Sequence, residues 1–223
     1  QLGAETHLVE KENLGGTCLN VGCIPTKALL HTSELYRMVK HGERIGLKGD
    51  SVTLDWPALL NRKQSVVRRL VGGVGGLLKA NGVAVHKGVG EVAGAGTVKV
   101  HGDKEEVLTA DVIIVASGSV PVKLNFPGAD LPGVIDSTGA LSLPKPPASM
   151  VIVGGGVIGI EIAALYAALD CKVTVVELLP EILPGIDSEI AATLKQTLVK
   201  EGVVFMNGAK LDSITQAAGG LAA

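Results

Sequence analysis

The segment Met150–Leu169 constrains the fold most, because it reads as a buried strand, a glycine turn and an apolar helix in immediate succession. Gly154, Gly156 and Gly159 have the spacing G-x-G-x-x-G. The first glycine of this pattern allows a tight turn, the second lets the backbone approach a pyrophosphate, and the third lets helix and strand pack closely. The segment therefore predicts a βα unit of a doubly wound α/β fold.

An acidic residue follows this turn at the spacing of a dinucleotide site. Cys171–Val176 reads as a second strand, and Glu177 ends it 18 residues beyond Gly159. A carboxylate at this place accepts hydrogen bonds from ribose hydroxyls and repels the extra phosphate of NADP, and no Lys or Arg between Glu177 and Gly185 favours that phosphate. We predict NAD binding, with the pyrophosphate at the helix start. The predicted residues are Gly154, Gly155, Gly156, Val157, Ile158, Gly159 and Glu177.

Two cysteines lie near the N-terminus in a second motif. Cys18 and Cys23 form a Cys-x4-Cys pair that is flanked by glycines and followed by Pro25 and a helix-favouring run. Five residues of ideal helix rotate the chain by about 500°, so the two side chains would not share a face. A bridge between them would need distorted backbone near Gly22. Strained, exposed disulfides are easily reduced, which indicates a redox-active pair; a zinc site would lack two further ligands.

The composition supports an intracellular α/β protein. Apolar residues make up 47% of the chain and aromatic residues 2%, so Val, Ile, Leu and Ala must build the core, and the 30 glycines suit many tight turns. A net charge of −2 gives no electrostatic basis for binding nucleic acid or anionic membranes, and no apolar run has the length of a membrane span. Three cysteines argue against a secreted disulfide scaffold. We expect Cys171 to be a small core residue.

The two motifs together resemble the pyridine nucleotide-disulfide oxidoreductases, over nearly the whole chain. The resemblance implies that electrons pass between NAD(H), the flavin of FAD, a disulfide and a dithiol substrate. Cys18 matches the interchange thiol and Cys23 the charge-transfer thiol next to the flavin. Lys27 matches a lysine beside the flavin, and Glu161 the acid that pairs with it near the nicotinamide. An ordinary surface salt bridge is the alternative interpretation of Lys27 and Glu161.

The resemblance and the analogy with Glu177 also imply an FAD site. Glu10 ends the short strand Thr6–Val9 and is expected to bind the adenosine ribose of FAD, although a solvated acid is the alternative. Ser117 stands where the family usually has Thr. Leu211, on the next strand, is expected to touch the adenine of NAD. The predicted FAD-binding residues are Glu10, Lys11, Gly15, Gly16, Thr17, Cys18, Lys27, Gly90, Ser117, Gly118 and Ser119.

The remaining segments predict local structure. We expect helices over 25–40 and 56–81, with the glycines of 71–77 serving close helix packing, and a turn at Lys48–Asp50. His86 and His101 are expected on exposed strand faces without a role. The predicted strands are Val83–Val92, which enters a small meander, its partners 97–100 and 106–108, and a buried strand over Asp111–Ala116.

We predict two Rossmann-like domains with a small antiparallel β-meander: an FAD-binding domain over 1–147 and an NAD-binding domain over 148–223, divided at Pro144–Pro147. Gln1–Gly3 reads as the end of a helix, so the start reads as the second half of a β-α-β unit. We therefore expect a fragment that lacks the first FAD strand with its phosphate loop, and the dimerisation domain with its acid–base His.

For the whole protein, the resemblance implies a homodimer that oxidises dihydrolipoamide with NAD⁺ in 2-oxo-acid dehydrogenase complexes. The expected compartment is the cytoplasm or the mitochondrial matrix. Two alternatives stay open. One is a glutathione- or mercury-type disulfide reductase, which commonly uses NADP. The other is a nucleotide-binding fragment without turnover.

Overall fold

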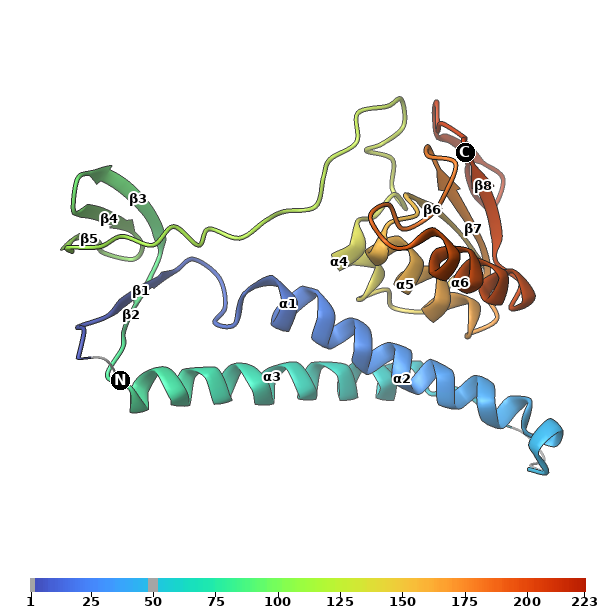
Figure 1. The fold of residues 1–223 in the computed structure, drawn as a ribbon, viewed down its shortest axis with the longest axis horizontal. Coiled ribbons are helices and arrows are strands. Elements are labelled where there is room, and N and C mark those ends of the chain that lie inside the picture. The colour runs from blue at the N-terminus through green and yellow to red at the C-terminus, as the bar shows by residue number, and fades with distance from the viewer. Residues whose placement is uncertain (1–2, 48–51) are drawn as a thin grey trace. The chain divides into compact units, whose positions relative to one another are not determined.

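The computed structural model describes residues 3–47 and 52–223. The predicted turn at Lys48–Asp50 and the start of the predicted helix end, Gln1 and Leu2, lie outside the described residues. The elements in chain order are β1 (His7–Glu10), α1 (Gly16–Val21), α2 (Cys23–Lys40), the 3₁₀ helix η1 (Gly42–Ile45), α3 (Trp56–Ala80), β2 (Ala84–Lys87), β3 (Val89–Gly94), β4 (Thr97–His101), β5 (Glu105–Thr109), α4 (Ser137–Ala140), β6 (Ser149–Val153), α5 (Val157–Ala167), β7 (Lys172–Glu177), α6 (Ser188–Lys200), β8 (Val204–Asn207), β9 (Thr215–Ala217) and β10 (Gly220–Ala222) (Figure 1).

Contacts divide the chain into two units. The first comprises residues 1–25 and 64–120, and the second residues 26–63 and 121–223. The predicted FAD- and NAD-binding domains, with their boundary at residue 147, stay a prediction. None of the helices in 3–47 and 52–223 combines the length and the apolar character of a membrane span.

The first unit contains a parallel strand pair and an antiparallel meander. β1 pairs with β2 in parallel, with Glu10 opposite Lys87. β3, β4 and β5 form the predicted meander, visible in green in Figure 1. The single strand predicted over Val83–Val92 is instead two strands that meet at Gly88, where φ is 154°. An added Cβ at Gly88 would lie 2.7 Å from the carbonyl oxygen of His101, so only glycine fits this crossing.

The histidines of this unit are hydrogen-bonded; His101 is exposed, as expected, whereas His86 is partly buried. His86 Nε2 lies 2.9 Å from Nδ1 of His7, and His86 Nδ1 lies 2.7 Å from a carboxylate oxygen of Glu106. His101 lies between Glu91 and Glu105, whose carboxylates raise its pKa. The His7–His86 and His101–Glu91 contacts join paired strands, whereas His86–Glu106 joins β2 to β5 of the meander, and a strand pattern alone does not reveal these contacts.

The predicted buried strand over Asp111–Ala116 is wrong. Val112, Ile114 and Val115 are 76%, 85% and 74% exposed, and the segment has no strand structure. Figure 1 draws it as an extended trace that continues towards residue 125. The run is apolar and β-branched, but a strand also needs a hydrogen-bonded neighbour. Among the described residues no strand pairs with it.

The second unit contains the predicted dinucleotide-binding sheet. β6, β7 and β8 are parallel in this order, with Val153 opposite Val176 and Glu177 opposite Asn207. α5 and α6 connect consecutive strands and cover one face of this sheet (Figure 1). Because parallel strands end at one edge, Gly154 after β6 and Glu177 at the end of β7 come together there. The Rossmann-like α/β fold is thereby confirmed.

Local sequence explains these elements. The run Lys172–Glu177 is rich in β-branched residues and forms β7 in the interior of the sheet. Asp187 caps α6 by accepting hydrogen bonds from the N–H groups of Glu189 and Ile190. α5 is apolar on most of its surface and buries five side chains, which suits a helix at the centre of a core.

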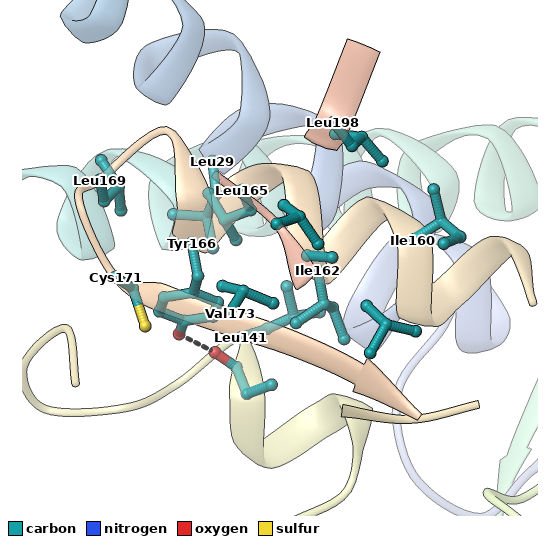
Figure 2. Packing of buried hydrophobic residues seen from close by; sticks show 14 of the residues in the cluster. Leu29, Leu141, Ile160, Ile162, Leu165, Tyr166, Leu169, Cys171, Val173 and Leu198 are labelled. Carbon is teal, nitrogen blue, oxygen red and sulfur yellow. Dashed lines mark hydrogen bonds between the residues drawn. The ribbon is translucent and has the colours of Figure 1, made fainter. Parts of the chain in front are cut away.

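A cluster of buried side chains around α5 forms the core of the second unit (Figure 2). Tyr166 is fully buried, and its hydroxyl donates to the carbonyl of Ala140. Burial, followed by the charge of Cys171, raises the pKa of Tyr166 to about 12. Cys171 is 6% exposed, as predicted for a core residue, and burial raises the pKa of its thiol to about 11.

The segment after α4 is fixed by two further donors from α3. Lys63 is 7% exposed and its Nζ donates to the carbonyl of Leu141 over 2.7 Å, while burial lowers its pKa. Trp56 Nε1 donates to the carbonyl of Leu143 over 2.8 Å. The chain that leads into β6 is therefore held from α3 as well as from α5.

Candidate active site and dinucleotide site

The cysteine pair lies at a break between two helices. α1 ends before Gly22, whose φ and ψ are −124° and −117°, and α2 begins at Cys23. Cys18 and Cys23 form a disulfide, with their Cα atoms 4.7 Å apart. The distortion predicted near Gly22 is present. An added Cβ there would lie 3.0 Å from Cys18 Cα and from the carbonyl oxygen of Thr17, so a side chain would require the neighbouring backbone to move by a few tenths of an ångström.

An asparagine between the cysteines positions the preceding glycines. Asn20 Nδ2 donates to the carbonyls of Leu14, over 3.0 Å, and Gly16, over 2.9 Å. Gly15 and Gly16 have φ of 98° and 67°, a conformation that glycine adopts readily. Asn20 is not among the residues predicted from the sequence. Its side chain can bond nearby main-chain groups, and this tendency was the available signal.

The predicted FAD residues of the first unit fall into two groups. The Cβ position of Gly118 lies 4.0 Å from Thr17 Oγ1, so the turn 117–119 meets the start of α1. The Cβ position of Gly90 lies 3.4 Å from Cγ1 of Val9, the neighbour of Glu10. Lys11 instead pairs with the exposed Glu12 over 3.8 Å.

Lys27 and Glu161, 134 positions apart, form an ion pair inside the second unit. Lys27 lies on α2, four residues after Cys23, and Glu161 on the first turns of α5. Their side chains are 59% and 28% exposed, so solvent screens the attraction and the pair contributes little to stability. The structure thus forms the pair that the resemblance implied, at a place where a ligand can reach it.

The three glycines of the phosphate turn differ in their surroundings. Gly154 has a φ of 109° and makes the turn. No atom lies within 4 Å of the Cβ position of Gly156, so the turn is open on that side. At Gly159 the Cβ position is only 2.1 Å from the carbonyl oxygen of Gly154 and 3.4 Å from Ile152 on β6. Val157 and Ile158 are 56% and 63% exposed on the first turn of α5.

Glu177 is held against this turn. Glu177 is 8% exposed, and its Oε2 accepts from the N–H of Gly155 over 2.5 Å. Its Oε1 accepts from the N–H of Leu179 over 2.7 Å. A carboxylate has about four acceptor positions, so each oxygen keeps acceptor capacity beyond these two bonds.

Glu10 repeats part of this arrangement in the first unit. Its carboxylate accepts from the N–H two residues later, that of Glu12, over 2.7 Å, as Glu177 does from Leu179. Each acid ends a strand that pairs in parallel with the next strand of its sheet. The strand that ends at Glu10 and the strand that ends at Glu177 therefore resemble each other also in the hydrogen bond of the terminal carboxylate.

The structure places Leu211 and Lys195, both C-terminal to Glu177, differently from what the sequence predicts. Leu211, predicted on the next strand, lies four residues beyond the end of β8 without strand structure. Lys195 on α6 lies 3.1 Å from Oδ1 of Asn207, the residue opposite Glu177. Lys195 lies ten residues beyond the segment 178–185 in the sequence, and only the fold brings α6 beside β8.

Comparisons with known proteins agree with this geometry. The model of the pyridine nucleotide-disulphide oxidoreductase family matches residues 1–222. The chain therefore belongs to this family.

Its relatives include dihydrolipoyl dehydrogenases. The enzyme of that name from Geobacillus stearothermophilus is 46% identical over 94% of this chain and 44% of its own length. One from Bacillus subtilis is 39% identical over 98% of this chain and 48% of its own length. The chain thus spans about half the length of these curated relatives. The HOCl-induced flavoprotein disulfide reductase RclA from Escherichia coli has a similar structure, with a TM-score of 0.83, 30% identity and coverage of 98% of this chain and 47% of its own.

Proposed function

We propose that the protein carrying this sequence is a flavin- and disulfide-dependent oxidoreductase that converts dihydrolipoamide and NAD⁺ to lipoamide, NADH and a proton. The observation that carries this proposal is the Cys18–Cys23 disulfide at the break between α1 and α2. The names of the relatives support the choice of substrate.

The thiol chemistry falls to the two cysteines. A substrate thiolate attacks Sγ of Cys18, the Cys18–Cys23 bond breaks, and its electron pair stays on Cys23 as a thiolate. The second substrate thiolate then displaces Cys18 and closes the substrate disulfide. The thiolates of Cys18 and Cys23 must then lose two electrons as their S–S bond re-forms. FAD, when bound, would supply the two-electron acceptor for this step and the redox link to NAD⁺.

The second unit fits NAD. The open side of Gly156 leaves room for a pyrophosphate at the start of α5. Glu177 offers its remaining acceptor positions to the ribose hydroxyls, and its charge disfavours a 2′-phosphate. Lys27 and Glu161 would hold the nicotinamide and flavin ends. Val157 and Ile158 would line the turn, and Leu211 the adenine.

The first unit fits part of an FAD site. Glu10 presents a carboxylate at a strand end, in the same bonding pattern as Glu177. Thr17 Oγ1 lies 4.0 Å from the Cβ position of Gly118, and the Cβ position of Gly90 lies 3.4 Å from Val9, the neighbour of Glu10. These contacts support FAD binding by the residues that the resemblance implied.

The whole protein would act as a homodimer within a 2-oxo-acid dehydrogenase complex, in the cytoplasm or the mitochondrial matrix. A glutathione- or mercury-type reductase is the second candidate. The bonded carboxylate of Glu177 favours NAD and so favours the dihydrolipoamide enzyme.

An absorbance spectrum of the complete protein tests the proposal. We expect a flavin spectrum as purified, and a new long-wavelength band after anaerobic addition of NADH, together with turnover of dihydrolipoamide. A protein that purifies with FAD but reduces glutathione disulfide with NADPH instead would contradict the substrate, and a protein that binds no flavin would contradict the whole assignment.

A further inference from the structure

The loop that follows Glu177 is tied to the nucleotide turn. This loop, residues 178–183, forms the first part of the connection from β7 to α6, and its residues Ile182 and Leu183 are buried in the core. The N–H of Leu183 donates to the carbonyl of Gly155 over 2.8 Å, and the N–H of Gly208 donates to the carbonyl of Leu179 over 3.0 Å. Leu183 has a φ of 55°, which is unfavourable for a branched side chain and persists only where surrounding contacts enforce it.

Asn207 supplies a side-chain contact to the middle of this loop. Its Nδ2 donates to the carbonyl of Pro180 over 2.8 Å, and its Oδ1 accepts from Lys195 Nζ over 3.1 Å. Lysine can only donate, so the amide oxygen must face Lys195 and the NH₂ group must face Pro180. Both the oxygen and the NH₂ group of the amide are therefore hydrogen-bonded, and Asn207 links α6 to the loop.

Lys195 is itself held by its surroundings. Its Nζ lies 5.5 Å from the centre of the Phe205 ring, a distance at which the ring face attracts a cation. Among the ion pairs of the described residues, none involves Lys195. The ammonium group of Lys195 therefore interacts with the amide oxygen of Asn207 and with the Phe205 ring.

We propose that Asn207, oriented by Lys195, is a positioning residue for the NAD site. The amide fixes Pro180, the loop then places the N–H of Leu179, and this N–H with that of Gly155 aims the Glu177 carboxylate at the ribose. The inference rests on the proposed function, because it takes Glu177 as the ribose ligand. It adds two residues that do not themselves touch the dinucleotide.

The substitution Asn207→Asp tests this role with little change of shape. The carboxylate still accepts from Lys195 but turns an oxygen, instead of a donor, towards the carbonyl of Pro180. We expect the Kd for NADH of the complete protein, measured by fluorescence titration, to rise about tenfold, as for one lost hydrogen bond and a new repulsion. We expect kcat at saturating NAD⁺ to stay unchanged, since Asn207 does not touch the reacting atoms. Lys195→Met should raise Kd about threefold.

Asn81→Asp is the matched control, because Asn81 Nδ2 donates to the carbonyl of Leu77 over the same 2.8 Å in the other unit. It should leave Kd unchanged. An unchanged Kd in Asn207→Asp, or a fall in kcat instead, would overturn the inference. If Asn207→Asp does not fold, an unchanged Kd in Lys195→Met overturns it. Glu177→Gln separates the two proposals: if this variant also binds NADH normally, the proposed ribose site fails as well.

Discussion

The Glu177 carboxylate accepts a hydrogen bond of 2.5 Å from the main-chain N–H of Gly155, which lies 22 residues earlier in the chain. The bond joins the end of β7 to the turn after β6, so the predicted ribose ligand and the predicted phosphate turn are already aligned in the protein alone. A charged acceptor strengthens such a bond, and its low exposure limits competition from water. The pair therefore acts as one unit, in which a change to either residue affects the other.

Replacement of Glu177 by Gln should weaken NADH binding by about ten- to a hundredfold, because a charged hydrogen bond to ribose is lost and an NH₂ group faces a main-chain donor. The preference for NADH over NADPH should fall as well, since the negative charge no longer repels a 2′-phosphate. Parallel titrations with both dinucleotides measure this. An unaltered ratio of the two Kd values would contradict the assigned role.

The two glycines Gly156 and Gly159 should respond differently to alanine. Gly156 has φ −74° and ψ 177° and open space at its Cβ position, so Gly156→Ala should keep the stability and reduce NADH affinity. Gly159→Ala would place a methyl group 2.1 Å from the carbonyl oxygen of Gly154 and should cost about 2–3 kcal/mol of unfolding free energy. Urea denaturation and NADH titration of both variants distinguish the effects. Equal destabilisation by the two variants would contradict this account.

Removal of the thiols should separate their roles. Cys23→Ser leaves no thiolate beside the flavin, so NADH should produce no long-wavelength band in the complete protein. Cys18→Ser frees Cys23 from the disulfide and should show that band before any reductant is added. Cys171→Ala removes the buried thiol outside the bridge and should behave as wild type. A band that survives in Cys23→Ser would reassign the two cysteines.

Tyr166 should titrate at unusually high pH. Because burial raises its pKa to about 12, its phenolate absorbance near 295 nm should appear only there, and Tyr166→Phe should abolish this step. The phenol of the unfolded chain ionises near pH 10. The contribution of Tyr166 to the unfolding free energy is therefore complete below about pH 10 and falls by about 1.4 kcal/mol per pH unit up to about pH 12. Loss of the bond to Ala140 should cost Tyr166→Phe about 1 kcal/mol at neutral pH. A phenolate step in wild type near pH 10 that vanishes in Tyr166→Phe would contradict this.

The parts of the fold that could be predicted from the sequence are those whose conformation depends on neighbouring residues in the chain. Met150–Glu177 forms the expected strand, turn, helix and strand because each glycine and each apolar run has a local reason for its conformation. Trp56–Ala80 is helical despite its glycines, since its length and apolar face outweigh their cost. Asp111–Ala116 failed because an apolar run indicates burial without supplying a partner strand.

The candidate sites show the same division. Cys18, Cys23 and the pair Lys27–Glu161 could be named from their motifs. Asn207 and Lys195 could not, because their contact joins α6 to β8 and depends on tertiary packing. His7 and His86 likewise meet only through the parallel pairing of β1 and β2.

Glu10 and Glu177 carry the same side-chain-to-main-chain bond in two sheets of one chain. The chain thus contains two strands that each end in a glutamate with the same local hydrogen bond. A substitution made at one glutamate can be repeated at the other, within a single protein and under identical conditions. The contrast between the two responses then shows what burial against the glycine turn adds at Glu177, since Glu10 makes the same bond but is only partly buried.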